Sequence, residues 1–252
     1  MIVEIEGKMT KLSVNVNKVA LLRNARTIGI PDVTHATQVC IDAGCHGITV
    51  HPRPDERHIT NRDAYELADL VGKIDGLEYN IEGNPFPEWL DIVRKTKPDQ
   101  ATLVPDDPNA FTSDHGWDLR DAETVARLKP IVGELKDLGI RVSMFMDPVP
   151  EQIEIAAEVG ADRIELYTEP YATAHREKNV ASVFRAFADG AKSAQDSGMG
   201  VNAGHDLNLD NLGEFVTIPD ILEVSIGHAL VGDALFMGLD RTVREYLRVL
   251  GH

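Results

Sequence analysis

One short pattern recurs along this chain and constrains its fold more than any other feature. A helical stretch ends in glycine, and within a few residues a run of β-branched and apolar side chains begins. Glycine suits the left-handed position just past a helix end, and such short apolar runs are typical of buried parallel strands. The pattern therefore predicts helices alternating with the strands of one parallel sheet. Its clearest copies are residues 40–44 before 47–50, 134–139 before 140–145, 156–160 before 163–167, and 194–198 before 200–203.

The number of repeats indicates a barrel, because eight strand–helix pairs in 252 residues match the size of a (β/α)8 barrel. A doubly wound open sheet is the competing fold, but it usually has fewer strands and often a Gly-x-Gly-x-x-Gly turn, which the sequence lacks. We predict one α/β domain over residues 1–252, a (β/α)8 TIM barrel with extra short helices, and an N-terminal extension at residues 1–10. Strands are expected near 11–16, 47–51, 78–82, 101–104, 140–146, 163–167, 200–203 and 222–226. Helices are expected near 33–43, 62–73, 86–96, 120–138, 150–159, 179–197, 208–217 and 240–249, with a further short helical piece at 232–239.

The acidic composition argues against several classes of partner. With a formal net charge of -16, the chain would be repelled by nucleic-acid phosphates and by anionic membrane surfaces. No stretch approaches the ~18 apolar residues of a membrane span, and the N-terminus lacks the pattern of a signal peptide. Two cysteines are too few for a disulfide framework, which indicates a reducing compartment. We therefore expect a cytoplasmic protein with no nucleic-acid or membrane partner.

Cationic side chains cluster directly after the second predicted strand. Residues 51–59 read His-Pro-Arg-Pro-Asp-Glu-Arg-His-Ile, with two arginines and two histidines in an acidic chain. Local positive charge of this kind favours anion binding, and the planar arginine fork suits phosphate or carboxylate. His51, at the strand end, can transfer a proton near neutral pH. The alternative is a solvated turn whose charges have no role.

Five of the eight predicted strands would bring a histidine or glutamate to one rim, since active-site residues of such barrels lie at the carboxyl ends of the strands. Each residue alone is more simply explained as structural, but burying several ionisable groups together is costly without a task. These five residues are His51, Glu82, Glu165, His205 and His228. The first strand ends in Asn15, Asn17 and Lys18, and Arg23 and Arg26 follow soon after.

Such a rim could exchange protons with a bound substrate or bind a divalent metal, as in metal-dependent hydrolases. The spacings His-x-His and His-Glu-x-x-His, typical of metal sites, are absent. Gly227 and Gly232, between the last strand and a helix, would expose backbone N–H groups to a phosphate. The sequence favours metal-free acid–base chemistry on phosphorylated small molecules. Two alternatives stay open: a metal-dependent hydrolase or isomerase that uses the five rim residues as ligands, and a non-catalytic phosphate-binding protein.

Short segments in a fixed order carry a family resemblance. They are Ser-Val-Asn at 13–15, Leu-Arg-Asn-Ala-Arg at 22–26, Gly-Ile-Thr-Val-His-Pro-Arg at 47–53 with Arg-His-Ile-Thr at 57–60, Asn-Ile-Glu at 80–82, Thr-Lys-Pro at 96–98, Leu-Val-Pro at 103–105, Val-Ser-Met-Phe at 142–145, Ile-Glu at 164–165, Val-Asn-Ala-Gly-His at 201–205 and Ile-Gly-His at 226–228. Together they span about residues 11–240, and the chain resembles the pyridoxine 5'-phosphate synthase family.

The resemblance implies a (β/α)8 barrel that condenses 1-deoxy-D-xylulose 5-phosphate with 3-amino-2-oxopropyl phosphate. The products would be pyridoxine 5'-phosphate, inorganic phosphate and water. It further implies no metal, no organic cofactor and a cytoplasmic homo-octamer. By position it assigns proton acceptors to His51 and Glu82, a proton donor to His205 and transition-state charge stabilisation to Glu165. It assigns the amino ketone phosphate to Asn15, Arg26, Gly227 and His228, and the deoxyxylulose phosphate to Arg53, His58 and Thr112.

Two departures from the family pattern concern expected substrate contacts. The chain has Asn17-Lys18 where the family has Asp-His, and Asp206 where it often has glycine. Lys18 keeps a cation at its position, whereas Asp206 would repel an anion unless its side chain turned away. Thr112 lies in the long loop 105–120, whose length is typical of a functional lid.

Overall fold

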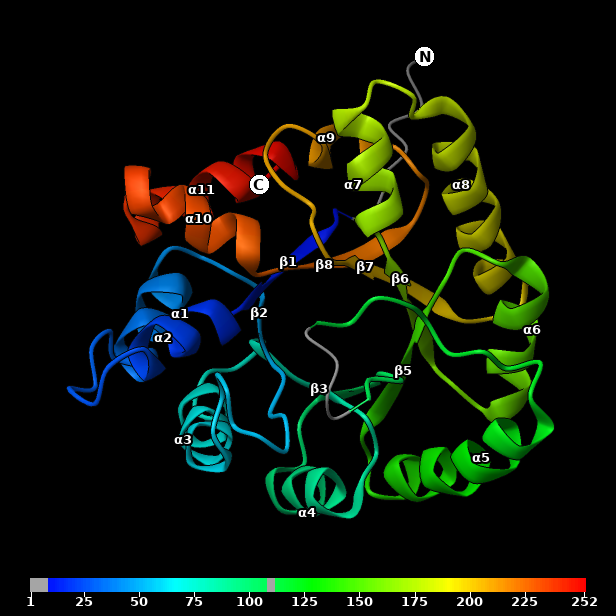
Figure 1. Cartoon of the computed structure of the whole chain (residues 1–252), viewed down its shortest axis with the longest axis horizontal. Coiled ribbons are helices and arrows are strands. Elements are labelled where there is room, and N and C mark those ends of the chain that lie inside the picture. The colour runs from blue at the N-terminus through cyan, green and yellow to red at the C-terminus, as the bar shows by residue number, and fades with distance from the viewer. Residues whose placement is uncertain (1–8, 108–111) are drawn as a thin grey trace.

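The computed structural model describes residues 9–107 and 112–252 and shows a closed barrel of eight parallel strands in chain order (Figure 1). The β1–β8 pairing, with Ser13 opposite Ser225, closes the barrel. The strands are β1 Lys11–Asn15, β2 Gly47–Val50, β3 Glu78–Gly83, β4 Gln100–Leu103, β5 Arg141–Met146, β6 Arg163–Tyr167, β7 Gly200–Gly204 and β8 Ile221–Ile226. The predicted (β/α)8 fold is therefore confirmed, and each strand bound agrees with its prediction to within one residue. Of the expected N-terminal extension, residues 1–8 lie outside the described part, and Met9 and Thr10 precede β1.

Helices surround the barrel and pack their apolar faces against its outer surface (Figure 1). They are α1 Asn17–Asn24, α2 Val33–Asp42, α3 Asn61–Val71, α4 Pro87–Thr96, α5 Ala122–Asp137, α6 Pro150–Val159, α7 Glu169–Arg176, α8 Ala181–Asp196, α9 Leu212–Phe215, α10 His228–Met237 and α11 Leu239–Val249. No helix in the described ranges is long and apolar enough to cross a membrane.

Several helix predictions were wrong in extent, and two helices were missed. The helix expected at 208–217 is only Leu212–Phe215, and the piece expected at 232–239 begins earlier, at His228. Helix α1 was missed because it follows β1 with only Val16 between them and without a glycine or proline signal, where the Asn15 side chain accepts the N–H of Asn17 (3.0 Å). Helix α7 was missed because it also follows its strand directly, although its first turn contains proline, a typical helix start.

The inside of the barrel is polar, whereas its outside is apolar. Side chains alternate along a strand, so Leu12 and Val14 of β1 belong to the hydrophobic core beneath the helices, while Ser13 between them bonds the Thr49 hydroxyl (2.7 Å). Asn80 continues this network, because its amide donates to Thr49 (3.3 Å) and its carbonyl accepts from Thr102 (3.0 Å). Hydrogen-bonded polar side chains therefore connect neighbouring strands inside the barrel.

An ion pair braces the loop that follows β2. Arg23 at the end of α1 makes a two-pronged contact with Asp63 (2.5 and 2.8 Å) and also donates to the His58 carbonyl (3.2 Å). Asp63 in turn forms a capping box with Thr60 at the start of α3. The cationic loop 51–59 is thus fixed from behind by α1, which holds its side chains toward the barrel mouth.

Candidate active site

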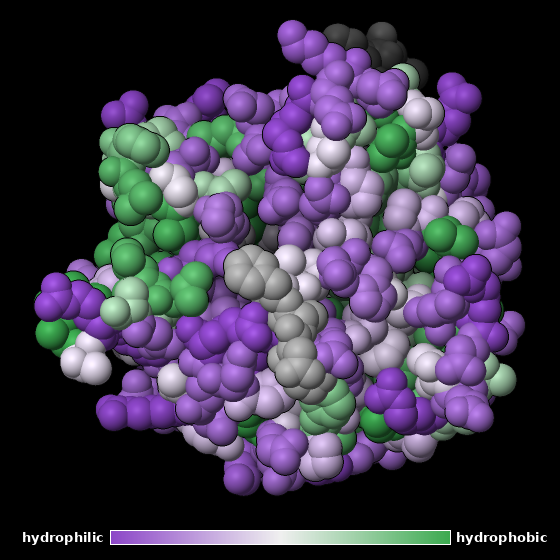
Figure 2. Space-filling view, in the orientation of Figure 1, coloured by the Kyte–Doolittle hydropathy of each residue, from purple (hydrophilic) through white to green (hydrophobic). Residues whose placement is uncertain are grey.

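One pocket of about 180 Å³ lies at the carboxyl ends of the strands. It contains every predicted site residue except Arg26: His51, Glu82, Glu165 and His205, with Asn15, Asn17, Lys18, Arg53, His58, Thr112, Asp206, Gly227 and His228. The side chains around the barrel mouth are mostly hydrophilic, and the described part of the loop between β4 and α5 lies across it (Figures 1 and 2). Residues distant in sequence therefore meet at one rim, as the strand-end pattern predicts.

Two arginines placed near this rim by the sequence lie elsewhere. Arg23 makes an ion pair with Asp63 and is not among the residues that line the pocket. Arg26 lies in the exposed stretch after α1 and is not among the residues that line the pocket. The cations at the pocket come instead from Lys18, Arg53 and Arg57.

His51 lies at the centre of the polar contacts, directly after β2. Its backbone N–H donates to the Asn17 side chain (2.9 Å), its Nδ1 lies 3.9 Å from Glu82 Oε2, and its Nε2 lies 3.8 Å from Asp106 Oδ2. Burial, together with Arg53 and Arg57, lowers the pKa of His51 to about 3. The imidazole is therefore neutral at pH 7 and has a lone pair with which to accept a proton.

The pKa values of Glu82 and Glu165 are raised, so both carboxyl groups favour the protonated, neutral form. Burial raises the pKa of Glu165 to about 7, and burial together with Glu165 and Asp106 raises the pKa of Glu82 well above its ordinary value. Glu82 also accepts a long hydrogen bond from Asn15 (3.4 Å). Carboxyl groups with raised pKa values beside a neutral imidazole are a typical arrangement for proton exchange near neutral pH.

Glycine at position 204 makes room for Glu165. The two residues lie on the adjacent strands β7 and β6, and a Cβ atom at Gly204 would collide with the Glu165 carboxylate. The absence of that side chain lets the carboxyl group lie between the strand ends. The Gly-His pair at 204–205 thus has a steric role as well as a chemical one.

His205 and Asp206 turn the chain sharply after β7. Both have left-handed backbones, with φ of 87° and 61°, a conformation that is unusual outside glycine but more accessible to His and Asp. This backbone explains why glycine suits position 206 in the family pattern. His205 Nε2 lies 3.3 Å from the Thr112 hydroxyl, and its ring packs edge-on against Tyr167, with 5.1 Å between ring centroids. Burial lowers the pKa of His205, opposed by Asp206, whose carboxylate lies 3.8 Å from Nδ1.

Anion-binding groups lie on two sides of these residues. On one side, Arg53 and His58 follow β2. Burial is the main cause that lowers the pKa of His58 to about 3, and the nearby charges of His51 and Arg53 add to it. On the other side, α10 begins at His228 after Gly227, with no side chain capping its first N–H groups. A Cβ at Gly227 would come within 3.1 Å of Asn15, so only glycine fits there without displacing Asn15. A helix N-terminus of this kind favours phosphate.

Sequence reasoning missed some residues of the site. Ser225 lines the pocket and hydrogen-bonds Glu82, and Ser113 and Phe145 also line it. Ser225 could have been found from its place in β8, two residues after Glu223 on the inward face. Asp106, which pairs with Arg53 at 2.5 Å, is the most important omission, and its place three residues past the end of β4 was the available signal.

A metal site is not formed by these groups. Within residues 9–107 and 112–252, no three histidine, cysteine, aspartate or glutamate side chains are arranged to hold a metal ion. The ligand set required by the metal-dependent alternative is therefore not assembled in the described structure.

Comparison with known proteins identifies the family. Residues 12–252 match the family described as "Pyridoxal phosphate biosynthesis protein PdxJ". The chain is 53% identical over 249 residues to pyridoxine 5'-phosphate synthase of Xanthomonas campestris pv. campestris (strain B100), covering 96% of both chains. It is 53% identical over 243 residues to the protein of that name from Bacteroides fragilis (strain YCH46), covering 96% of this chain and 100% of the relative.

Solved structures show the same fold at low identity. The tryptophan synthase a2b2 complex of Pyrococcus furiosus aligns with a TM-score of 0.66 and 11% identity, covering 96% of this chain and 98% of that one. This likeness concerns the barrel alone, whereas the sequence matches span nearly the whole chain. The chain belongs to the PdxJ family of pyridoxal phosphate biosynthesis proteins.

Proposed function

We propose that this protein is a pyridoxine 5'-phosphate synthase. It condenses 1-deoxy-D-xylulose 5-phosphate with 3-amino-2-oxopropyl phosphate to give pyridoxine 5'-phosphate, phosphate and water. Curated relatives with this name, 53% identical over nearly the whole chain, support the proposal. The observation that carries it is the single pocket in which a neutral His51 faces Glu82 and Glu165, whose pKa values are raised, between two groups of anion-binding residues.

The first steps require protons to move in both directions. The substrate amine attacks the ketone carbon of the sugar phosphate, a C–N bond forms, and the carbinolamine hydroxyl leaves as water after taking a proton. The amine must lose its protons during this sequence, and neutral His51 can accept one. Burial raises the pKa of Glu82, whereas a cationic amine beside it would lower that pKa and favour its action as a base. His205, at the opposite side of the rim, would return a proton to the leaving group.

The two phosphates would bind at opposite sides of the pocket. The start of α10 with Asn15 suits the phosphate of the amino ketone, which the product retains on its hydroxymethyl carbon. Arg53 and His58 suit the phosphate of the sugar, which leaves as inorganic phosphate. Residue Arg26, which the resemblance assigns to the amino ketone phosphate, is exposed and would have to approach from outside the pocket.

The decisive experiment mixes purified protein with both substrates and measures pyridoxine 5'-phosphate by mass spectrometry, with each substrate omitted in turn. His51→Asn is the matched variant, because asparagine keeps polarity but cannot serve as a base. Well-folded protein that makes no product would end the proposal. Product formed equally by His51→Asn would remove His51 from the mechanism.

We also propose a cytoplasmic homo-octamer. Large apolar side chains on α10 are exposed, with Leu235 at 72% and Phe236 at 92%, and hydrophobic residues gather over α10 and α1 (Figure 2). Exposed apolar patches of this kind are typical of subunit contacts. Light scattering coupled to size-exclusion chromatography measures the mass, and a monomer at micromolar concentration would contradict this proposal.

A further inference from the structure

Arg53 is paired with a carboxylate at the edge of the pocket. Its side chain is 4% exposed, and Nη1 donates to Asp106 Oδ2 at 2.5 Å while Nη2 donates to the Asp107 carbonyl at 3.1 Å. Both terminal nitrogens of the guanidinium group therefore face the segment 106–107, which follows β4. A phosphate in the pocket therefore competes with Asp106 for the Nη1 side of this planar fork.

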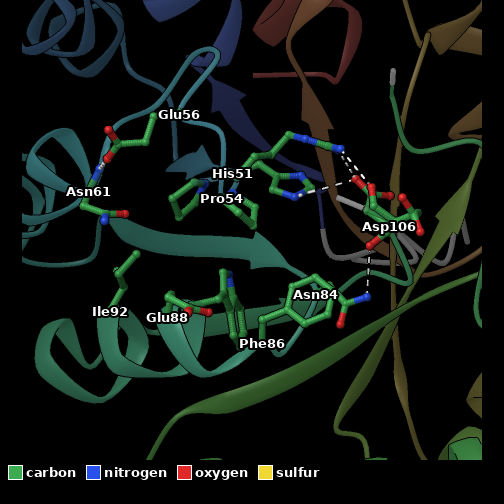
Figure 3. Close-up of a pocket in the computed structure, with 13 residues that line it drawn as sticks. His51, Pro54, Glu56, Asn61, Asn84, Phe86, Glu88, Ile92 and Asp106 are labelled. Carbon is green, nitrogen blue, oxygen red and sulfur yellow. Dashed lines mark hydrogen bonds and ion pairs between the residues drawn. The ribbon is translucent and has the colours of Figure 1, made fainter. Parts of the chain in front are cut away.

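Asp106 lies behind Arg53 and outside the catalytic pocket. It lines a second hollow of about 220 Å³, which shares His51 and Arg53 with the catalytic pocket and is otherwise bounded by both apolar side chains such as Trp89 and polar ones such as Asn84. Figure 3 shows Asp106 at the edge of this hollow, with His51 on one side and Asn84 on the other. The hollow offers space into which the carboxylate can withdraw without unfolding the strand end.

The other contacts of Asp106 leave its carboxylate replaceable. The Ser113 hydroxyl donates to Asp106 Oδ2 at 3.0 Å. Asn84 donates to the backbone carbonyl of Asp106 at 3.0 Å, so this contact holds the backbone and does not involve the carboxylate. A buried arginine without an anion would be costly. The Asp106 carboxylate neutralises Arg53 and so offsets the free-energy cost of burying its charge. An anion of higher charge can replace this carboxylate.

We propose that Asp106 is a specificity-determining residue that occupies the anion position on Arg53 until a phosphate dianion displaces it. This proposal rests on the proposed function of the pocket, which assigns the sugar phosphate to Arg53. A phosphate monoester carries about -1.5 to -2 charges at pH 7 and three acceptor oxygens, so it outcompetes one carboxylate. A monoanion with two oxygens offers Arg53 nothing that Asp106 does not already supply. The exchange therefore excludes carboxylate metabolites and selects phosphate esters.

Equilibrium binding tests the proposal most directly. The affinity for 1-deoxy-D-xylulose 5-phosphate is measured by isothermal titration calorimetry without the second substrate, for the wild type, Asp106→Asn and Asp114→Asn. Asp114 lies on the same loop but is exposed and pairs with His115, so it controls for the loss of one negative charge there. Removing the competing charge should tighten binding about tenfold in Asp106→Asn and leave Asp114→Asn unchanged. Unchanged or weaker binding by Asp106→Asn would show that Asp106 only positions Arg53, and would overturn the proposal.

Competition between acetate, a monoanion, and the sugar phosphate gives a second test. Its result with the wild type is sufficient to refute the proposal. At constant ionic strength, acetate should not weaken sugar phosphate binding to the wild type but should do so in Asp106→Asn, whereas inorganic phosphate should compete in both. Acetate that competes equally well with the wild type would refute the proposal, even if Asp106→Asn failed to fold.

Kinetics separates this proposal from the proposed function. In Asp106→Asn the KM for the sugar phosphate should fall by the same factor as its dissociation constant, and the KM for the amino ketone phosphate should not change. A wild type that makes product while Asp106→Asn shows no gain in affinity contradicts only the role of Asp106. A wild type that makes no product, but whose Asp106→Asn variant binds phosphate esters more tightly, contradicts only the proposed reaction.

Discussion

Replacing Glu165 with glutamine should make the protein more stable and less active. Burial raises the pKa of Glu165 from 4.5 to about 7, so the folded protein binds this proton more tightly than the unfolded chain does. The corresponding stability is fully present below pH 4.5 and is lost as the pH rises through 7. The shift of about 2.5 units corresponds to about 3 kcal/mol of stability lost by the wild type at pH 8, at about 1.4 kcal/mol per unit. Glutamine cannot ionise, so Glu165→Gln should escape that loss.

Urea unfolding at pH 5 and pH 8 measures this difference. We expect Glu165→Gln to be more stable than the wild type by about 3 kcal/mol at pH 8 and by less than about 1 kcal/mol at pH 5. Its turnover should fall by about 10²–10³ if Glu165 stabilises transition-state charge. Glu154→Gln, an exposed position on α6, should show neither effect. Equal stability differences at the two pH values would refute the argument that burial holds the proton on Glu165.

Three further changes test the site and its support. His51→Asn should lower turnover by about 10²–10⁴ while calorimetry still detects phosphate ester binding, and loss of both together would mean that His51 is mainly structural. Gly204→Ala should displace the Glu165 carboxylate and lower kcat by about 10², whereas Gly133→Ala, which has open space on α5, should leave kcat unchanged. Arg23→Met should leave Asp63 buried without its cation and destabilise the protein by about 2 kcal/mol, a prediction that fails if the urea midpoint does not move.

The strands could be predicted from sequence because their signal is local. Each apolar run such as 47–50 is bounded by a helix-ending glycine and a polar strand end, and the parallel barrel buries it on both faces. Helices α1 and α7 were missed because they lie between a strand and the main helix of their repeat. The only local signal was the proline in the first turn of α7. Their existence depends on packing around the barrel mouth, which is a tertiary property.

The site residues could be predicted as a group because the fold alone brings strand ends together. What the sequence could not supply was which cation each carboxylate neutralises. Arg23 and Arg53 look alike as loop arginines, yet Arg23 is tied to Asp63 across 40 residues and Arg53 to Asp106 across 53. These pairings depend on how neighbouring loops meet in space, and so neither the Asp63 partner of Arg23 nor the role of Asp106 could be predicted from the sequence.

The hydrogen-bonded interior of the barrel also fixes how its strands align. A strand can slide past its neighbour by two residues and still point the same faces inward and outward, so a purely hydrocarbon interior would tolerate such a shift with little penalty. Here the hydrogen bonds form at one register only, among Ser13, Thr49, Asn80 and Thr102. A shift of one of these strands would leave buried hydrogen-bond donors without acceptors. Mutational drift at these positions should therefore proceed by compensating pairs of changes, since a lone Thr49→Val would remove the bond to the Ser13 hydroxyl and leave the Asn80 amide N–H without its acceptor.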